Sequence, residues 1–399
     1  MSTPEPTRRV LVAHPSPDLY GSDRQLLESV EAMVDAGWRV RVVLPDEGPL
    51  GELLEERGAH VLTSTFPVLR KALLTPRGLV TLALAAAPAL LRLRTLVRLS
   101  RADVLYVNTV TIPLWLAAGR LARVPVVCHA HEAEEEQPRA IRAAMAAPML
   151  LAHAVVANSA AAKGALARAF PLLRPRIEVV HNGVPDSGQP RAPLERAPWA
   201  RPVRLALVSR LSPRKGVDVA LEALGELRRQ GVDAMLDVCG TTFPGYEWYE
   251  EQLRDRADRE DLAGAVTFHG YVSPTRPVLD EADIVLVPSR LEPFGNTAVE
   301  GLLAERTVVA SRIQGLREVI QDGHTGVLVE PGSAPALAEA ISALVAEPER
   351  AAGLARAGRA DALARFSVER YRTRIADVLH RAWSAPSSRS PRSPRRRNR

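Results

Sequence analysis

The 399-residue sequence contains only two cysteines, three lysines and few aromatic residues, and no apolar run long enough to cross a membrane. Cys128 and Cys239 cannot build a disulfide framework, and neither has the CxxC or Cys/His spacing of a zinc site. The stretch Gly78–Leu91 is uncharged and mainly apolar, but it is shorter than the about 20 apolar residues that a membrane-spanning helix needs. The first residues lack the apolar run of a secretory signal, so we expect a cytoplasmic protein.

An excess of basic charge is confined to the end of the chain. The sequence has 52 basic and 46 acidic residues, and six of the arginines lie in Ser384–Arg399, which contains no acid. The rest of the chain is therefore balanced, which excludes a basic DNA-binding body, and it offers no aromatic platform for RNA. We expect residues 384–399 to form a disordered basic tail and no specific nucleic-acid partner.

Short apolar segments of strand length alternate with segments of helical periodicity. Helices are expected at Asp23–Ala36, where Ser22 and Gln25 fit a capping box, and at Val217–Arg229. The expected strands are Val10–His14, Arg39–Leu44, Val104–Asn108, Val124–His129, Ala154–Ala157, Ile177–His181, Arg204–Ser209, Ala234–Cys239, Val266–His269 and Ile284–Pro288.

Apolar strands separated by helices favour parallel sheets that are covered by helices on both faces. We therefore predict an α/β protein with two Rossmann-like, doubly wound domains that face a cleft. The predicted segments are a first domain over 1–187, a Pro-rich linker over 188–202, a second domain over 203–365, and a helix over 366–383 that packs back on the first domain. Ligands of such sheets bind at the carboxyl ends of the strands.

Two loops at predicted strand ends could bind an anion. Gly21 follows the first strand and adjoins a helix start, where backbone N–H groups can approach phosphate, although turn formation alone also explains it. Arg210 and Lys215 follow a strand of the second domain, where they could grip phosphate oxygens. The alternative for these two residues is a solvated cation at a helix start.

The segment from Ser289 to Glu300 is the most informative part of the sequence. It follows a predicted strand, and a helix is expected to begin near Asn296 or Thr297. Glu292 and Glu300 would then face one pocket with free backbone N–H groups between them. Such a pocket suits a ligand with both hydroxyls and phosphates, although a surface pair of carboxylates is the alternative.

The two glutamates, separated by seven residues, resemble the EX7E motif of retaining glycosyltransferases of family 4, which have the GT-B fold. The resemblance extends along most of the chain. It includes Ser209-Arg210 with Lys215-Gly216, His181-Asn182-Gly183-Val184, Phe268-His269-Gly270-Tyr271, Gly315-Leu316-Arg317-Glu318 and Asp322-Gly323-His324-Thr325-Gly326.

The chain departs from the family pattern at several positions. Glu305 stands where the family often has glycine, Thr307 stands for proline, and Gln314 replaces the first residue of a Gly-Gly pair. At the N-terminal loop the frequent Gly-Gly is represented by Tyr20-Gly21. We expect these differences to change the local backbone conformation and the preference for a particular donor.

The resemblance implies transfer of a sugar from a nucleoside diphosphate sugar with retention at the anomeric carbon. It implies that Arg210 and Lys215 neutralise the diphosphate, that Glu300 binds ribose hydroxyls and that Glu292 holds sugar hydroxyls. The remaining nucleotide and substrate contacts would come from Gly21, Tyr271, Phe294, Gly295, Asn296 and Thr297. A sugar-nucleotide 2-epimerase of the same fold is the alternative.

His131 follows a predicted strand and, with Glu132, resembles the family pair at the cleft, where the imidazole approaches the donor sugar. His129 and His131 could instead be metal ligands, but no third ligand has convincing spacing, and a structural histidine is the other alternative. The sequence has no Asp-x-Asp, so we expect no metal and no other cofactor.

The span between Glu56 and Asp103 has no acid and eight basic residues. It contains Gly78–Leu91, which is too short to cross a bilayer but suited to lie in its surface. We therefore expect peripheral attachment to the inner face of the cell membrane and a lipid-linked or glycolipid acceptor of cell-envelope polysaccharide synthesis. The alternative is that this stretch packs inside the first domain.

Overall fold

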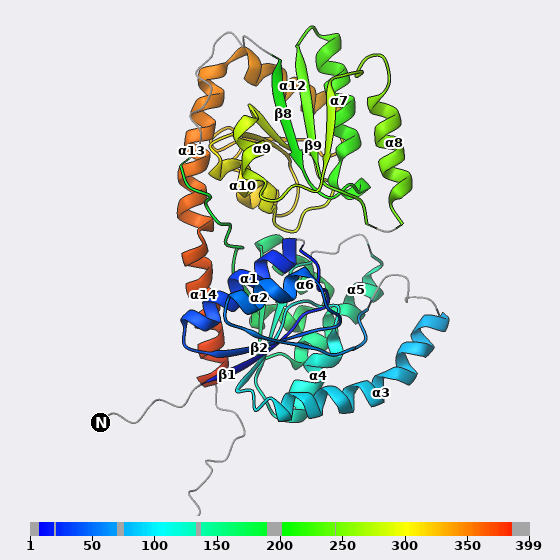
Figure 1. Ribbon diagram of the computed structural model, residues 1–399, viewed down its shortest axis with the longest axis vertical. Coiled ribbons are helices and arrows are strands. Elements are labelled where there is room, and N and C mark those ends of the chain that lie inside the picture. The colour runs from blue at the N-terminus through cyan, green and yellow to red at the C-terminus, as the bar shows by residue number, and fades with distance from the viewer. Residues whose placement is uncertain are drawn as a thin grey trace, which may run out of the picture. The chain divides into compact units, whose positions relative to one another are not determined.

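The computed structural model describes residues 8–19, 21–69, 76–132, 137–189, 202–243 and 245–384, without the side chains of 76–84. The chain folds into two compact units (Figure 1). The first unit contains Met1–Asn158, Ala162–Val180 and Tyr371–Arg399, and the second contains Ser159–Ala161 and His181–Arg370. The first unit is therefore built from three separate stretches of sequence.

The first unit has a parallel sheet of seven strands in the order β3-β2-β1-β4-β5-β6-β7. The strands are β1 (Arg9–Ala13), β2 (Arg39–Leu44), β3 (His60–Thr63), β4 (Val104–Val107), β5 (Val126–Ala130), β6 (Ala154–Ala157) and β7 (Ile177–Val179). The central strands are completely buried because helices cover both faces of the sheet.

One face of this sheet packs against α1 (Gly21–Asp35), α2 (Pro49–Glu56) and α14 (Val368–Ser384). The C-terminal helix α14 contributes Tyr371, Ile375, Val378, Leu379 and Ala382 to this core, and Arg372 donates to Glu28 of α1. The other face packs against α3 (Pro76–Leu99), α4 (Pro113–Ala122), α6 (Ala160–Ala169), η2 (Ala147–Leu151) and η3 (Pro171–Arg176), and α5 (Arg139–Ala146) precedes η2.

The second unit has a parallel sheet of six strands in the order β10-β9-β8-β11-β12-β13. The strands are β8 (Val203–Val208), β9 (Ala234–Cys239), β10 (Val266–Gly270), β11 (Ile284–Val287), β12 (Thr307–Ser311) and β13 (Val327–Val329). The helices are η4 (Pro213–Lys215), α7 (Val217–Arg229), α8 (Glu247–Ala257), α9 (Arg276–Glu281), α10 (Asn296–Leu303), α11 (Leu316–Val319), α12 (Ala334–Ala346) and α13 (Pro348–Phe366).

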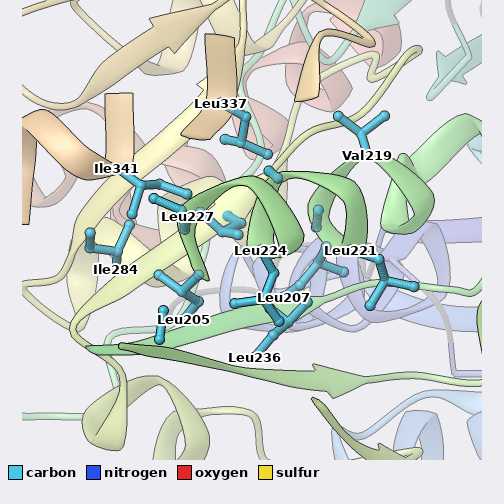
Figure 2. Packing of buried hydrophobic residues seen from close by; sticks show 14 of the residues in the cluster. Leu205, Leu207, Val219, Leu221, Leu224, Leu227, Leu236, Ile284, Leu337 and Ile341 are labelled. Atoms are coloured by element: carbon cyan, nitrogen blue, oxygen red, sulfur yellow. The ribbon is translucent and has the colours of Figure 1, made fainter. Parts of the chain in front are cut away.

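Apolar periodicity explains how α7 sits on the second sheet. Leu221, Leu224 and Leu227 recur at helical spacing and pack against Leu205 and Leu207 of β8 (Figure 2). Burial of each such side chain stabilises the fold by about 1.5–3 kcal/mol. The opposite face of the sheet buries α10 and the last turns of α13.

The prediction of an α/β protein with two doubly wound parallel sheets is confirmed. Three strands were not predicted. β3 and β13 are short and lie at the edges of the two sheets, and β12 follows α10 without a glycine or proline to mark its start.

The predicted capping box is wrong. Helix α1 begins at Gly21, so Ser22 lies inside its first turn, where its hydroxyl donates to Asp23 at 3.2 Å. Most of the predicted linker (190–201) and all but the first residue of the predicted tail (385–399) lie outside the described residues. Ser384, the first residue of that tail, is the last residue of α14.

Candidate functional site

The strand order of each sheet reverses between two neighbouring strands, β1 and β4 in the first unit and β8 and β11 in the second. Loops that leave neighbouring strands in opposite directions open a crevice at the carboxyl edge of the sheet, where ligands of such folds bind. Several of the predicted site residues lie in or next to the loops at these two points.

Lys215 and Glu292 form an ion pair in the second unit. Lys215 ends η4, which follows β8, and Glu292 lies in the loop after β11. Lys215 Nζ lies 2.5 Å from Glu292 Oε2, and the Ser289 hydroxyl donates to the same oxygen at 3.3 Å. The two side chains are only 23% and 12% exposed. A cation and a carboxylate, from loops 77 residues apart, thus meet at the point where the strand order reverses.

Two glycines allow these loops to approach so closely. Gly216 adopts φ 69°, and a Cβ atom there would lie 2.0 Å from the carbonyl oxygen of Pro288. Gly240 adopts φ 146°, and its Cβ would lie 1.7 Å from the carbonyl oxygen of Ser209. Any other residue would clash with backbone, so these glycines fix the spacing of the loops around Lys215.

The start of α10 is held from several sides. Gly295 precedes the helix at φ 113°, and a Cβ atom there would lie 2.6 Å from the Leu316 side chain. Asn296 accepts a hydrogen bond from the Asn182 amide at 2.9 Å, and the Thr297 hydroxyl donates to the carbonyl of Val208 at 3.1 Å. These contacts fix the first turn of the helix, where backbone N–H groups remain available to an anion.

Phe294 has a different environment from the other predicted site residues. Its ring is 2% exposed and stacks on the His181 ring, with the centroids 5.8 Å apart, and it meets Phe366 edge to face. The side chain belongs to the core, so a ligand could be contacted only by the backbone of Phe294.

Three predicted residues lie around the same edge of the second sheet. Glu300 on α10 accepts a hydrogen bond from the Thr275 hydroxyl at 2.9 Å. Tyr271 follows β10 and is 53% exposed. The Arg210 guanidinium stacks 4.2 Å from the centroid of the Phe243 ring, which holds a flexible side chain in one orientation.

Gln314 and Glu305, which replace glycines of the family pattern, both adopt left-handed backbone conformations, with φ 28° and φ 54°. Gln314 gains a contact that glycine could not make, because its side-chain oxygen accepts the backbone N–H of Glu292 at 3.0 Å. Glu305 lies just beyond the end of α10, a position that glycine usually occupies. Sequence reasoning marked these departures but missed that Gln314 supports Glu292.

In the first unit, His131 belongs to a hydrogen-bonded chain of four side chains. His14 follows β1, Asn108 follows β4 and His131 follows β5. Asp23 Oδ1 lies 2.9 Å from His14 Nε2, Asn108 Nδ2 lies 3.0 Å from His14 Nδ1, and His131 Nε2 lies 3.0 Å from Asn108 Oδ1. Asp23, His14 and Asn108 are at most 3% exposed. Only His131 of this chain was predicted as a site residue.

His131 is a neutral imidazole at physiological pH. Burial lowers its pKa to about 3, with a further lowering by His14. His129, whose Nδ1 lies 2.6 Å from the Tyr106 hydroxyl, also has its pKa lowered well below the usual value by burial.

Glu132 accepts the backbone N–H of His131 at 2.9 Å and the Thr109 hydroxyl at 2.7 Å, which fixes the turn after β5. Gly21, the other predicted residue of this unit, is the first residue of α1 and is exposed.

Glu318 ends the segment Gly315-Leu316-Arg317-Glu318, which resembles the family sequence, and it binds two backbone N–H groups. Its carboxylate accepts from Ala160 at 2.8 Å and from Ala161 at 2.7 Å, and lies 3.2 Å from His181 Nε2. Burial would raise the pKa of Glu318, but these hydrogen bonds lower it below the usual value. Glu318 therefore joins the short segment Ser159–Ala161 to the second unit.

The histidines do not form a metal centre within the described ranges. No group of three or more His, Cys, Asp and Glu side chains in that part of the chain could hold a metal ion. The His129 and His131 rings lie 4.0 Å apart and are tilted by 37°, while His129 is fully buried.

Both halves of the chain match known families. Residues 20–187 match the family described as Glycosyltransferase Family 4, and residues 199–361 match Glycosyl transferases group 1. The HepE protein of Anabaena, solved in complex with UDP and glucose, has a TM-score of 0.79 and 25% identity, and the likeness covers 93% of this chain and 99% of HepE.

Curated relatives are similar over a smaller part of the sequence. The glycogen synthase of Mycobacterium tuberculosis is 33% identical over 220 residues, which are 55% of this chain and 51% of that protein. The D-inositol 3-phosphate glycosyltransferase of Segniliparus rotundus is 32% identical over 275 residues, which are 64% of this chain and 60% of that enzyme. The chain thus spans between half and three fifths of these relatives.

Proposed function

This chain belongs to family 4 of the glycosyltransferases and has their GT-B fold, and we propose that it transfers a sugar from a nucleoside diphosphate sugar to an acceptor hydroxyl, with retention. The bond between C1 of the sugar and the diphosphate oxygen breaks, and the nucleoside diphosphate leaves with the electron pair. The acceptor oxygen forms the new bond to C1, and its proton passes to the departing diphosphate.

The observation that carries this proposal is the contact between Lys215 and Glu292 beside the start of α10. A nucleoside diphosphate sugar has diphosphate oxygens and sugar hydroxyls close together, so it needs a cation and a carboxylate as neighbours. Lys215 and Arg210 would stabilise the leaving diphosphate, and Glu292 would accept from sugar hydroxyls. The backbone N–H groups of Asn296 and Thr297 would add hydrogen bonds from the helix start.

The nucleoside would lie towards the other side of α10. Glu300 would accept from the ribose hydroxyls, and Thr275 already holds its carboxylate in place. The exposed ring of Tyr271 would lie near the base. HepE is described in complex with UDP and glucose, so we propose a uridine diphosphate sugar as the donor, with UDP-glucose as the first compound to test.

In the first unit, His131 would contact a hydroxyl of the donor sugar, and the backbone at Gly21 would approach its phosphates. The support is the family resemblance together with the neutral state of His131. A neutral imidazole does not attract the carboxylate of a uronic acid donor. We therefore propose a donor sugar with a hydroxyl at that position.

The proposal is tested by thermal unfolding of the full chain with a panel of nucleoside diphosphate sugars. A ligand at 100 times its Kd adds about 2.7 kcal/mol to the apparent stability, so the true donor raises the Tm by several degrees. Absence of stabilisation by every uridine, guanosine and adenosine diphosphate sugar would contradict donor binding. Conversion of the donor alone into an epimer, without an acceptor, would favour the 2-epimerase instead.

We propose that transfer needs no divalent metal. The support is that Arg210 and Lys215 supply positive charge at the same strand end. Activity is expected to persist in a chelator. Loss of activity in chelator that is reversed by magnesium or manganese would contradict this part of the proposal.

For the acceptor we propose a lipid-linked saccharide or glycolipid, with the protein attached peripherally at the cytoplasmic face of the membrane. None of the helices in the described part of the chain is both long and apolar enough to span a bilayer. Helix α3 exposes Leu91 (60%) and Leu99 (72%) beside Arg92 and Arg98. Anionic lipids would attract these basic residues, each by about 1 kcal/mol.

Flotation with anionic liposomes at low and high salt tests this attachment. The full chain is expected to float at low salt and to dissociate at high salt, and a chain that ends at Trp383 shows whether the basic tail contributes. If neither floats, the membrane proposal fails and a soluble acceptor becomes the better hypothesis, with donor binding unaffected.

A further inference from the structure

A basic cavity lies at the amino edge of the first sheet, away from the strand ends that carry His14, Asn108 and His131. It has a volume of about 360 Å³. Its polar lining consists of Arg9 at the start of β1, Arg39 and Arg41 on β2, and Ser100 and Arg101 after α3, with Leu99 at one side. None of these residues contacts the donor in the transfer proposed above, and only Leu99 also belongs to the surface proposed for membrane attachment.

The strand register places the basic side chains on one face of the sheet. Arg9 is the direct neighbour of Arg39 in the parallel pairing of β1 and β2, and Arg41 is the neighbour of Leu11. Because side chains alternate along a strand, Arg9, Leu11, Arg39 and Arg41 all point to the same side. Like charges on neighbouring strands repel one another, so this arrangement is unfavourable without an anion.

The four arginines of the cavity have no carboxylate partner among the described residues. Asp103 Oδ2 accepts a hydrogen bond from the backbone N–H of Arg9 at 3.0 Å, not from its guanidinium group. Asp103 does not line the cavity. Some other arginines of the same unit are paired with acids, as in Arg57 with Glu31 and Arg372 with Glu28. The cavity differs because it gathers four arginines and has no carboxylate among its lining residues.

We propose that this cavity is a second anion site, which binds a phosphate group at the edge of the sheet opposite His131. Guanidinium groups bind phosphate oxygens through two parallel N–H donors, and Arg9, Arg39, Arg41 and Arg101 could approach one phosphate from several sides. The 72% exposed side chain of Leu99 gives the rim an apolar surface. The phosphate could belong to a lipid headgroup, whose acyl chain Leu99 would contact, or to a free diphosphate.

The test compares the double variant Arg39→Gln/Arg41→Gln with the matched control Arg139→Gln/Arg174→Gln. The control removes two exposed arginines of the same unit that do not line the cavity. Binding of inorganic pyrophosphate is measured by calorimetry, and binding to phosphatidylglycerol and phosphatidylcholine vesicles by flotation. Circular dichroism verifies that both variants fold.

The double variant is expected to bind one pyrophosphate ion fewer per protein molecule, or to bind phosphatidylglycerol vesicles about thirtyfold more weakly. The control is expected to match the wild type in both measurements. A loss for vesicles alone assigns the site to a lipid headgroup, and a loss for pyrophosphate alone assigns it to a free diphosphate. Equal binding by the double variant and the control, to both probes, overturns the proposal. Donor-induced thermal stabilisation should be the same in all three proteins, which separates this site from the transfer site.

Discussion

The imidazole of His131 is joined to the side chain of Asn108, with 3.0 Å between His131 Nε2 and Asn108 Oδ1. An amide oxygen only accepts hydrogen bonds, so His131 Nε2 must carry the proton. Since His131 is neutral, its Nδ1 is left with a free lone pair. The side chains of His14 and Asp23 hold Asn108 in this orientation, so two buried residues decide which nitrogen of His131 accepts.

We predict that nitrogen-15 NMR will find Nε2 of His131 protonated and Nδ1 unprotonated at neutral pH, with His131→Gln used to assign the signals. Asn108→Asp places a carboxylate beside the ring and should raise the pKa of His131, because a negative charge favours imidazolium. Asn108→Leu should instead release the ring into a mixture of tautomers. A protonated Nδ1 in the wild type would contradict this arrangement.

Lys215→Ala and Glu300→Ala are each expected to reduce transfer by roughly ten- to a hundredfold or more, because a lost charge-assisted contact costs about 1.5–3 kcal/mol. Activity is measured as nucleoside diphosphate release, and circular dichroism verifies that the variants fold. Glu339→Ala removes an exposed carboxylate on α12 and serves as the control. Turnover close to that of the wild type in either site variant would refute that residue's assignment.

Gly216→Ala should destabilise the second unit by about 3 kcal/mol or more. The left-handed backbone costs an alanine about 1–2 kcal/mol, and its methyl group would overlap the Pro288 carbonyl, which forces the two loops apart. Gly231→Ala is the matched control, since Gly231 has φ 83° but no atom within 4 Å of the position that a methyl group would take. It should lose only about 1–2 kcal/mol in urea unfolding, and equal losses at the two positions would argue against the overlap.

Glu305→Gly is expected to stabilise the protein by about 0.5–1 kcal/mol. Glycine removes the left-handed strain, which exceeds the extra entropy that glycine loses on folding. Ala304→Gly changes the adjacent residue, whose φ is −73°, and should destabilise the protein instead. A loss of stability in both variants, measured by the midpoint of urea unfolding, would mean that Glu305 makes contacts worth more than its strain.

As the pH is lowered, the first unit should begin to lose stability near pH 6.5, which is above the pH range in which carboxylates become protonated. The unfolded chain binds protons at His129 and His131 below about pH 6.5, whereas burial lowers the pKa of both rings in the folded chain, to about 3 for His131. His131 therefore makes the stability fall by about 1.4 kcal/mol per pH unit as the pH drops from about 6.5 towards 3, and the lowered pKa of His129 acts in the same direction. His131→Gln should reduce the slope of unfolding free energy against pH by that amount, and an unchanged slope would contradict the low pKa.

The sequence predicted the parts of the site that follow strands along the chain. Lys215 and Glu292 each lie in the connection that follows an apolar strand, so their place at one sheet edge follows from the alternation of strands and helices. The chain of Asp23, His14 and Asn108 could not be found in this way. His14 and Asn108 follow two different strands and Asp23 lies in the first turn of α1, and no local spacing marks them before the strand order is known.

Side-chain environment was harder to predict than position. Phe294 was grouped with the binding residues because it lies inside the motif, but its ring is buried against His181 and Phe366. Gln314 was read only as a missing glycine, whereas its amide supports Glu292. In both cases the deciding contact comes from a segment distant in sequence, which a linear pattern does not contain.

The placement of α14 in the core of the first sheet sets an order for folding during synthesis. The ribosome delivers the seven strands of that sheet first, but Tyr371, Ile375 and Leu379 emerge only after the whole contiguous segment 181–370 of the second unit. One apolar face of the nascent sheet stays incompletely covered for that interval, since the helix that closes it does not yet exist. The first unit is thus completed only after the second unit, and a chain released shortly before residue 371 would have a complete second unit and an open first one.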